Sequence, residues 1–264
     1  MEPTFRDRLQ RGPCLGTCIT FTDPTVTEAL CGVLDFVWID MEHNPLSLAA
    51  VQGHILATKG SDTVPLVRVA WNDPVLIKPV LDIGAAGIIV PLVQSAEEAR
   101  RAVAACRYPP DGIRGYGPRR PSRYGRLGGP EFCHAANAAI AVIIQVEHIE
   151  GVRNIDEILA VPGVTSVVLG PNDLSGSMGL MGQPRHPEVL KAIETVIDRG
   201  RRAGVPVGVG TGDDPEVLIE WLDKGARWLA MGADFTLLLR AAGQVAGRVR
   251  EKARAGNPPA RAGG

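Results

Sequence analysis

The feature that most constrains this sequence is an alternation, repeated eight times, of a short apolar run with an amphipathic segment. The apolar runs contain few polar residues, which is typical of strands in a parallel sheet that is covered on both faces. The amphipathic segments have the spacing of helices that turn one face towards such a sheet. Eight strand-then-helix units fit the roughly 250 residues of a closed barrel, so the pattern predicts an α/β fold, a single-domain (β/α)₈ TIM barrel.

The boundaries of these units follow from the apolar runs and from helix-start signals. We expect strands at residues 15–20, 36–40, 65–69, 87–91, 141–147, 165–170, 206–210 and 227–231. We expect helices at residues 25–31, 46–59, 74–83, 96–106, 149–160, 187–203, 215–224 and 235–252. No break in composition divides the chain, so we predict one domain over residues 1–254. The tail, 255–264, has too few apolar residues to pack and is expected to be disordered.

One connection is much longer than the others. Residues 107–130 separate the fourth helix from the fifth strand and lead into a short helical segment at 131–139. Connections of this length in compact domains are usually functional or disordered. This one is rich in arginine, at Arg107, Arg114, Arg119, Arg120, Arg123 and Arg126. These side chains could meet an anionic substrate or a neighbouring subunit, or they could form a solvated basic loop.

The bulk properties exclude several classes of function. A formal net charge of −1 argues against a nucleic-acid or membrane partner recruited by charge. Five scattered cysteines without CxxC spacing are typical of reduced thiols. The N-terminal residues lack the apolar core of a signal peptide, and no apolar run reaches about 18 residues. We therefore expect a cytoplasmic protein that acts on small molecules.

Two carboxylates follow neighbouring strands. Glu147 ends the apolar run AVIIQVE, and Asp173 follows the next run, VTSVVLG, within Gly-Pro-Asn-Asp. Consecutive parallel strands joined by one crossover helix place their carboxyl ends side by side. Two adjacent carboxylates repel each other unless a proton or a cation lies between them, and Mg²⁺ is often held by one or two carboxylates. The alternative is that each acid caps the helix or turn that follows it.

Other polar residues occur at the same strand ends, where barrel enzymes carry their active sites. His43 follows the second strand, Arg68 lies near the end of the third, and Gln145 lies on the fifth. An imidazole can transfer protons at neutral pH, and a guanidinium can stabilise an enolate oxygen. The alternatives are that His43 is a surface residue and that Arg68 pairs with nearby acids.

Two other mechanisms have weaker support. A Schiff base needs a desolvated lysine in the pocket, but the lysines lie on expected helices or their ends: Lys59, Lys78, Lys191, Lys224 and Lys252. The glycine-rich stretch 208–212 could form a phosphate site of the kind built by late barrel loops, or a tight turn.

Six segments carry a resemblance to a known family. They are IDMEHNP, PLVRVAWNDP, IIVPLVQSAEEAR, RYPPDGIRGYG, IIQVEHIEGV and VVLGPNDLSGSMG, in this order and spacing. The chain resembles the HpcH/HpaI family of metal-dependent (class II) pyruvate aldolases over nearly its whole length.

The resemblance implies roles for individual residues. It makes Glu147 and Asp173 the metal ligands, His43 the acid/base and Arg68 the group that stabilises the enolate. It places Gln145 beside the metal and pyruvate, and it makes the loop with Gly170, Pro171 and Asn172 the place where the pyruvate carboxylate is held. It also implies a homo-hexamer, a trimer of dimers that exchange a C-terminal helix at residues 235–252.

The predicted function is therefore that of a carbon–carbon lyase, an aldolase that forms a pyruvate enolate from a 2-oxo acid and joins it to, or releases it from, an aldehyde. The expected cofactor is Mg²⁺, Mn²⁺ or Co²⁺, since all three suit an oxygen-rich site. An oxaloacetate decarboxylase or a condensing enzyme of the same family is the alternative, and a non-catalytic barrel that binds a keto acid is a second. Differences from many relatives at Met41, His148 and residues 19–22 concern the aldehyde side of the pocket.

Overall fold

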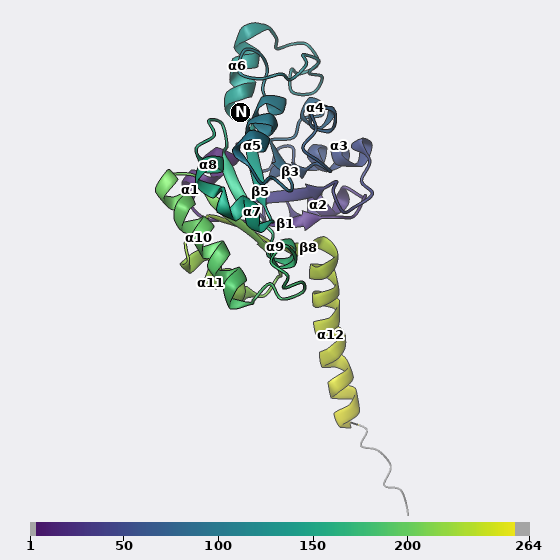
Figure 1. The fold of residues 1–264 in the computed structure, drawn as a ribbon. Helices are drawn as coiled ribbons and strands as arrows, with labels where there is room; N and C mark the ends of the chain where they lie inside the picture. The colour runs from purple at the N-terminus through teal and green to yellow at the C-terminus, as the bar shows by residue number, and fades with distance from the viewer. Residues whose placement is uncertain (1–3, 257–264) are drawn as a thin grey trace, which may run out of the picture.

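The computed structural model describes residues 4–256 and forms a closed parallel barrel in which the strands follow one another in chain order (Figure 1). The strands are β1 (Cys14–Ile19), β2 (Phe36–Asp40), β3 (Val64–Arg68), β4 (Gly87–Val90), β5 (Ala141–Val146), β6 (Ser166–Leu169), β7 (Val207–Thr211) and β8 (Trp228–Ala233). The helices are α1 (Phe5–Arg11), α2 (Thr25–Leu30), α3 (Leu48–Ala57), α4 (Pro74–Asp82), α5 (Ala96–Cys106), α6 (Gly129–Ala139), α7 (Ile149–Arg153), α8 (Ile155–Leu159), α9 (Pro171–Ser177), α10 (Pro187–Ala203), α11 (Pro215–Asp223) and α12 (Asp234–Gly256). The predicted (β/α)₈ fold is confirmed.

Every expected strand is present, with ends shifted by no more than two residues. The helix expected at 149–160 is instead two short helices, because Asn154 lies between them and its side-chain amide donates to the carbonyl oxygen of Gln94 at 2.9 Å. The sequence analysis did not predict α1 or α9. Helix α12 continues to Gly256, two residues into the expected tail, and the rest of that segment lies outside the described residues.

Helix α1 closes the N-terminal end of the barrel. Its start is fixed by a capping box, in which the Thr4 hydroxyl accepts from the Asp7 N–H and the Asp7 carboxylate accepts from the Thr4 N–H. Phe5 is fully buried, and its ring meets those of Phe36 and Trp228 edge to face, with centroids 5.8 and 5.4 Å apart. An apolar plug therefore fills this end of the barrel.

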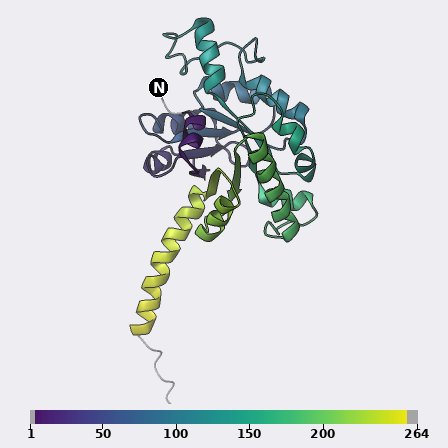
Figure 2. The ribbon, with the colours of Figure 1, turned by 90° about the vertical axis from the view of Figure 1, so that its left-hand side faces the viewer.

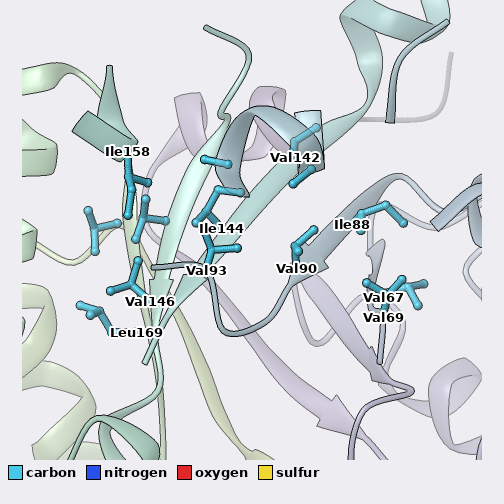
Figure 3. Close-up of a cluster of buried hydrophobic side chains, with 14 of the residues drawn as sticks. Val67, Val69, Ile88, Val90, Val93, Val142, Ile144, Val146, Ile158 and Leu169 are labelled. Atoms are coloured by element: carbon cyan, nitrogen blue, oxygen red, sulfur yellow. The ribbon is translucent and has the colours of Figure 1, made fainter. Parts of the chain in front are cut away.

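Alternate strand residues face the barrel interior or the surrounding helices. On β5, Ile143 belongs to the inner cluster with Phe5, whereas Ile144 and Val146 belong to the outer cluster, which also includes Ile158 of α8 (Figure 3). This alternation of period two continues to the strand ends. It explains why Gln145, which lies between Ile144 and Val146, is on the inner side.

The glycine-rich stretch is part of β7 rather than a loop. A side-chain carbon on Gly208 would lie 2.2 Å from the indole of Trp228. Glycine is required there because the Trp228 ring packs directly against the backbone of the strand. Because packing against Trp228 already explains why residue 208 is a glycine, Gly208 does not support the phosphate-site interpretation.

Helix α12 leaves the barrel after β8 and extends away from it (Figures 1 and 2). Large apolar side chains on this helix are exposed, including Leu238, Val245 and Val249. Across residues 4–256, no helix has both the length and the apolarity needed to cross a membrane.

Candidate active site

Arg68 is the centre of a polar cluster at the C-terminal mouth of the barrel. Its backbone is paired with that of Asp40 on the neighbouring strand, so both side chains enter the barrel at the same level. The Arg68 Nε donates to Asp40 Oδ1 at 2.8 Å, one terminal nitrogen lies 3.0 Å from Glu42 Oε2, and the guanidinium lies 5.1 Å from the centre of the Trp38 ring. The ion pairs foreseen as an alternative role for Arg68 are present.

These contacts keep both groups charged. Burial works against the charge on Arg68, but the hydrogen bond and charge of Asp40, together with the charge of Glu42, outweigh it and raise the pKa of Arg68. Burial also favours the neutral form of Asp40, and the hydrogen bond from Arg68 overcomes this and lowers the pKa of Asp40. The same terminal nitrogen of Arg68 also lies 3.5 Å from Gln145 Oε1, which extends the cluster to β5.

Glu147 lies one residue beyond β5 and is 3% exposed. Its Oε1 accepts from the backbone N–H of Leu92 at 2.9 Å, and its Oε2 accepts from the side-chain amide of Gln145. It does not cap α7, since His148 does so by accepting from the Glu150 N–H. The capping alternative for Glu147 is therefore wrong, and its carboxylate is held inside the mouth.

Burial raises the pKa of Glu147 to about 7. The hydrogen bond from Leu92 and the charge of Arg68 oppose this rise, whereas the charges of Glu42 and Asp173 add to it. The pKa of Glu42 is also raised, first by burial and further by Asp40 and Asp173, against the effect of Arg68. The charge of Asp173 therefore raises the pKa of both Glu42 and Glu147, and the charge of Arg68 opposes the rise at both residues.

Asp173 lies in the first turn of α9, which begins immediately after β6. Gly170 is the N-cap of this helix and Pro171 is its first residue. Because glycine has no side chain, no side-chain hydrogen bond caps the start of the helix. Asp173 is exposed, and so is Asn172, whereas Pro171 is buried. Val146 pairs with Leu169 at the ends of β5 and β6, so Glu147 and the first turn of α9 lie at the same end of the barrel.

Gly170 lies directly beside the Glu147 carboxylate. A side-chain carbon on Gly170 would lie 2.9 Å from Glu147 Oε2 and 3.4 Å from the amide nitrogen of Gln145. Its φ of −103° is open to any residue, so glycine is needed here for space rather than for backbone conformation. The lack of a side chain on Gly170 lets the backbone before α9 pack directly against the Glu147 carboxylate.

His43 lies at the solvent edge of the cluster. Its side chain is 64% exposed, and its Nε2 lies 3.8 Å from Glu42 Oε2. It is therefore on the mouth of the barrel, as predicted, and is less firmly held than Arg68 or Glu147.

The donor atoms of this cluster fit a hard divalent cation. Glu147 and Asp173 offer carboxylate oxygens. Burial raises the pKa of Glu147, with the charges of Glu42 and Asp173 adding to the rise, and a bound cation would favour the charged form of this carboxylate. Within residues 4–256, no three or more His, Cys, Asp or Glu side chains are grouped as a metal site. A cation here would take its remaining ligands from water and from substrate oxygens, as Mg²⁺ commonly does.

Glu42, which follows β2 in the same polar run as His43, was expected only as a possible ion-pair partner of Arg68. Leu92 and Trp38 had no predicted role. Leu92 carried no signal, since it contributes a backbone N–H from the segment after β4, where it adopts a φ of 55° that is uncommon for a non-glycine residue. The sequence places Trp38 on a strand but does not indicate its contact with Arg68.

Comparisons with known proteins agree with this geometry. A family model described as HpcH/HpaI aldolase/citrate lyase matches residues 22–241. The 4-hydroxy-2-oxo-heptane-1,7-dioate aldolase of Salmonella paratyphi C (strain RKS4594) is 42% identical over 252 residues, covering 94% of this chain and 95% of that protein.

Solved structures give the same result. An HpcH/HpaI aldolase/citrate lyase family protein from Burkholderia cenocepacia J2315 is 34% identical with a TM-score of 0.86, covering 93% of this chain and 98% of its own. The citrate synthase SbnG is 28% identical with a TM-score of 0.84, covering 95% and 98%. The family and the aldolase class predicted from the sequence are confirmed, and the chain belongs to the HpcH/HpaI aldolase/citrate lyase family.

Proposed function

We propose that this chain is a divalent-metal-dependent aldolase that cleaves or forms 4-hydroxy-2-oxo acids, with pyruvate as one product or donor. The observation that supports this most strongly is the buried Glu147 carboxylate at the same barrel mouth as the Arg68 guanidinium, which Asp40 and Glu42 hold by ion pairs. The name of the 42% identical relative supports the substrate class. Cleavage of its substrate between carbons 3 and 4 gives pyruvate and a four-carbon aldehyde acid.

Glu147 and Asp173 are the proposed ligands, with Mg²⁺, Mn²⁺ or Co²⁺ as the ion. When bound there, the cation supplies a Lewis acid for the 2-oxo group. Gln145 keeps Glu147 in place through its amide. Gly170, Pro171 and Asn172, at the start of α9, form the proposed binding segment for the substrate carboxylate. The backbone N–H groups of Gly170 and Asn172 are donors suited to an anion, whereas Pro171 has no N–H.

Arg68 stabilises the charge that develops on the enolate oxygen. As the bond between carbons 3 and 4 breaks, its electron pair moves into the enolate and negative charge accumulates on the former keto oxygen. Asp40 and Glu42 hold the guanidinium in a fixed orientation, so it needs no reorganisation during the reaction. Arg68 can therefore form ion pairs with Asp40 and Glu42 and still take part in catalysis.

His43 is the proposed acid/base. In the cleavage direction it removes the proton of the 4-hydroxyl group, which becomes the aldehyde oxygen, and a proton is then delivered to carbon 3 to give the methyl group of pyruvate. Its exposed ring can exchange the proton with water.

The test is deuterium incorporation into the methyl group of pyruvate in D₂O, followed by mass spectrometry on metal-stripped protein with and without each cation. Exchange should depend on added metal and should be lost in Asp173→Asn. Asp156→Asn is the matched control, since Asp156 forms an exposed ion pair with Arg199 away from the mouth. Metal-independent exchange, or full exchange in the Asp173 variant, would contradict the proposal.

The similarity to a citrate synthase favours one alternative, that the same enolate arises from oxaloacetate with loss of CO₂ and is then protonated or condensed. Steady-state assays with oxaloacetate and with a 4-hydroxy-2-oxo acid separate the two functions. A kcat/KM at least tenfold higher for oxaloacetate would favour the alternative.

We further propose that the protein is a cytoplasmic homo-oligomer, a hexamer built as a trimer of dimers that exchange α12. The support is the row of small and apolar residues along one side of α12, formed by Leu238, Ala241, Ala242, Val245, Ala246 and Val249. Such a row on a helix that extends from its own barrel needs cover from another chain. The five free cysteines are consistent with a reducing compartment.

A further inference from the structure

A hollow lies at the opposite end of the barrel from the candidate active site. It encloses about 820 Å³ beside the N-terminal ends of β3, β4 and β5, whereas Arg68 and Glu147 lie at the C-terminal ends. Its walls come from the end of α3, the turn between α4 and β4, the end of α6 and the long arginine-rich connection that precedes α6. Figure 1 shows this connection and α6 standing out from the barrel.

The lining of this hollow is strongly cationic. Five basic residues contribute to it, and no Asp or Glu does: Lys59, Arg114, Arg120, Arg123 and Arg126. Arg114 pairs with Asp82 at 2.8 Å, and within the described part of the chain none of the other four forms an ion pair. Four uncompensated charges around one space repel one another, and an anion would relieve this repulsion.

The connection holds its arginines in a fixed arrangement. The hydroxyl of Ser122, 1% exposed, donates to the Arg119 carbonyl oxygen at 3.0 Å and accepts from the Gly125 N–H at 3.1 Å. Arg123 and Tyr124 have φ values of 51° and 57°, a region that non-glycine residues seldom adopt. Strained backbone of this kind persists only where the surroundings determine it, and it is concentrated at functional sites.

This arrangement separates neighbouring arginines. Arg120, Arg123 and Arg126, spaced three residues apart, all line the hollow, but Arg119 does not. Arg120 also lies against the backbone of Gly84, so closely that a side-chain carbon on that glycine would lie 2.7 Å from its guanidinium. The contact fixes Arg120 at the wall.

One deeper group has an unmet donor. Arg114 is 5% exposed, its guanidinium stacks 4.4 Å from the centre of the Tyr108 ring, and its Nε has no hydrogen-bond partner among the described residues. Buried donors in folded proteins are nearly always paired, so an unpaired one next to a hollow indicates that a further acceptor belongs there.

The lining also has apolar residues, among them Ile55, Leu81 and Ile140, together with the hydroxyl groups of Thr4, Thr58, Ser61 and Thr63. We propose that this hollow binds an organic phosphate, with the phosphate groups on the arginines and an apolar body against the apolar residues. Arginine pairs with phosphate oxygens through two parallel hydrogen bonds, and the volume lies within the range of sites for small organic ligands. The site is independent of the proposed aldolase chemistry.

The test is calorimetric titration of the full-length, assembled protein with ADP, isopentenyl diphosphate and pyrophosphate, with adenosine as the uncharged probe. Both organic diphosphates should bind more tightly than pyrophosphate, adenosine should not bind, and affinity should fall as salt rises. The double variant R120Q/R123Q should lose at least about tenfold in affinity, since charge-assisted hydrogen bonds are removed. R119Q, its neighbour outside the hollow, should bind like the unaltered chain.

Three results would overturn the proposal. The first is that no diphosphate binds with a dissociation constant below about 10 mM. The second is an equal loss of affinity in R119Q and in R120Q/R123Q, and the third is equal affinity for pyrophosphate and both organic diphosphates. The altered arginines are at least partly exposed, so the double variant should fold. Unchanged deuterium exchange into pyruvate would verify that the double variant is folded. The single variant R126Q provides a second, milder test of binding in the hollow.

Discussion

At the scale of single residues, Glu147 combines a role in chemistry with a cost to the fold. Its carboxylate is buried among other acids, and burial raises its pKa to about 7. The unfolded chain would have the ordinary value near 4.5. The protonated form is therefore favoured by folding, and the stability it contributes is fully present below about pH 4.5 and is lost as the pH rises through about 7.

Replacing Glu147 with Gln should therefore stabilise the metal-free protein at pH 8. The amide oxygen can still accept from the Leu92 N–H without carrying a charge, whereas its NH₂ group faces the Gln145 amide, which must rotate to accept from it. The pKa shift corresponds to roughly 3 kcal/mol at most. The gain should shrink as the pH is lowered from 8 to 5.5, and metal-dependent exchange should be lost. Denaturant unfolding with chelator across this pH range measures it, and a lower stability of the variant at pH 8 would be evidence against a destabilising charge.

Arg68→Lys should reduce pyruvate exchange by about 10²-fold or more, as is typical when a group that stabilises an oxyanion is lost. A lysine ammonium keeps the charge but cannot hold Asp40 and Glu42 with separate nitrogens. The measurement is the exchange rate at saturating pyruvate. Near-normal rates with lysine would mean that charge alone, without the fixed guanidinium, is sufficient.

The sequence was informative about residues that follow strands. Glu147, Asp173, His43 and Arg68 could be placed at one mouth because parallel strands all point the same way. The contact between Gln145 and Glu147 could not be predicted, since it depends on side-chain orientation inside the barrel. Leu92 acts through its backbone and so leaves no chemical signal in the sequence.

At the scale of elements, α12 is joined to the loop after β1 by one carboxylate. Asp234, the first residue of α12, is 4% exposed and accepts from the N–H and hydroxyl of Thr20 and from the N–H of Phe21, at 2.6–3.0 Å. The carbonyl oxygen of Phe21 lies 3.0 Å from Nε2 of the buried His54. Helix α12 is thus anchored at its start, and its apolar row extends outward.

Val245→Glu should dissociate the proposed oligomer, because it places a charge in the middle of that row. Gln244→Glu is the matched control, since residue 244 adds the same charge one position away and outside the row. Light scattering coupled to size-exclusion chromatography measures the mass of each. Equal masses for both variants and the unaltered chain would contradict an association through this side of α12.

The elements that the sequence failed to predict are short. Helices α1 and α9 each have seven residues, too few for a clear helical period, and α9 begins with a Gly-Pro pair that indicates a turn. The break between α7 and α8 depends on the contact from Asn154 to Gln94, which is distant in sequence. Long helices such as α5 and α10 were placed correctly because their apolar face repeats over several turns.

At the scale of the whole molecule, the candidate active site and the aromatic plug lie at opposite ends of the barrel. Charged groups gather at the C-terminal mouth, and aromatic rings fill the other end, where α1 inserts Phe5. The closed barrel was predictable because eight repeated units have few other ways to bury two apolar faces. The plug was not, since nothing in the sequence of α1 indicates what it covers.

Phe5→Ala should destabilise the protein by about 3–5 kcal/mol, as expected for the loss of a buried phenyl ring. Pyruvate exchange at 25 °C should remain within about twofold, because the ring is far from Glu147 along the strands. Denaturant unfolding and exchange assays on the same preparation measure both. A comparable loss of activity in folded protein would show that the two ends of the barrel are coupled.

The first and last helices lie at opposite ends of the barrel, since α1 supplies part of the aromatic plug and α12 begins beside the mouth. Genetic fusion of a reporter or an affinity tag is therefore not equivalent at the two termini. A passenger added ahead of α1 would sit next to the basic hollow and leave subunit pairing free. In the proposed oligomer, one added behind α12 would compete for space with a neighbouring subunit, so an enzyme intended for immobilisation should be attached through its N-terminus.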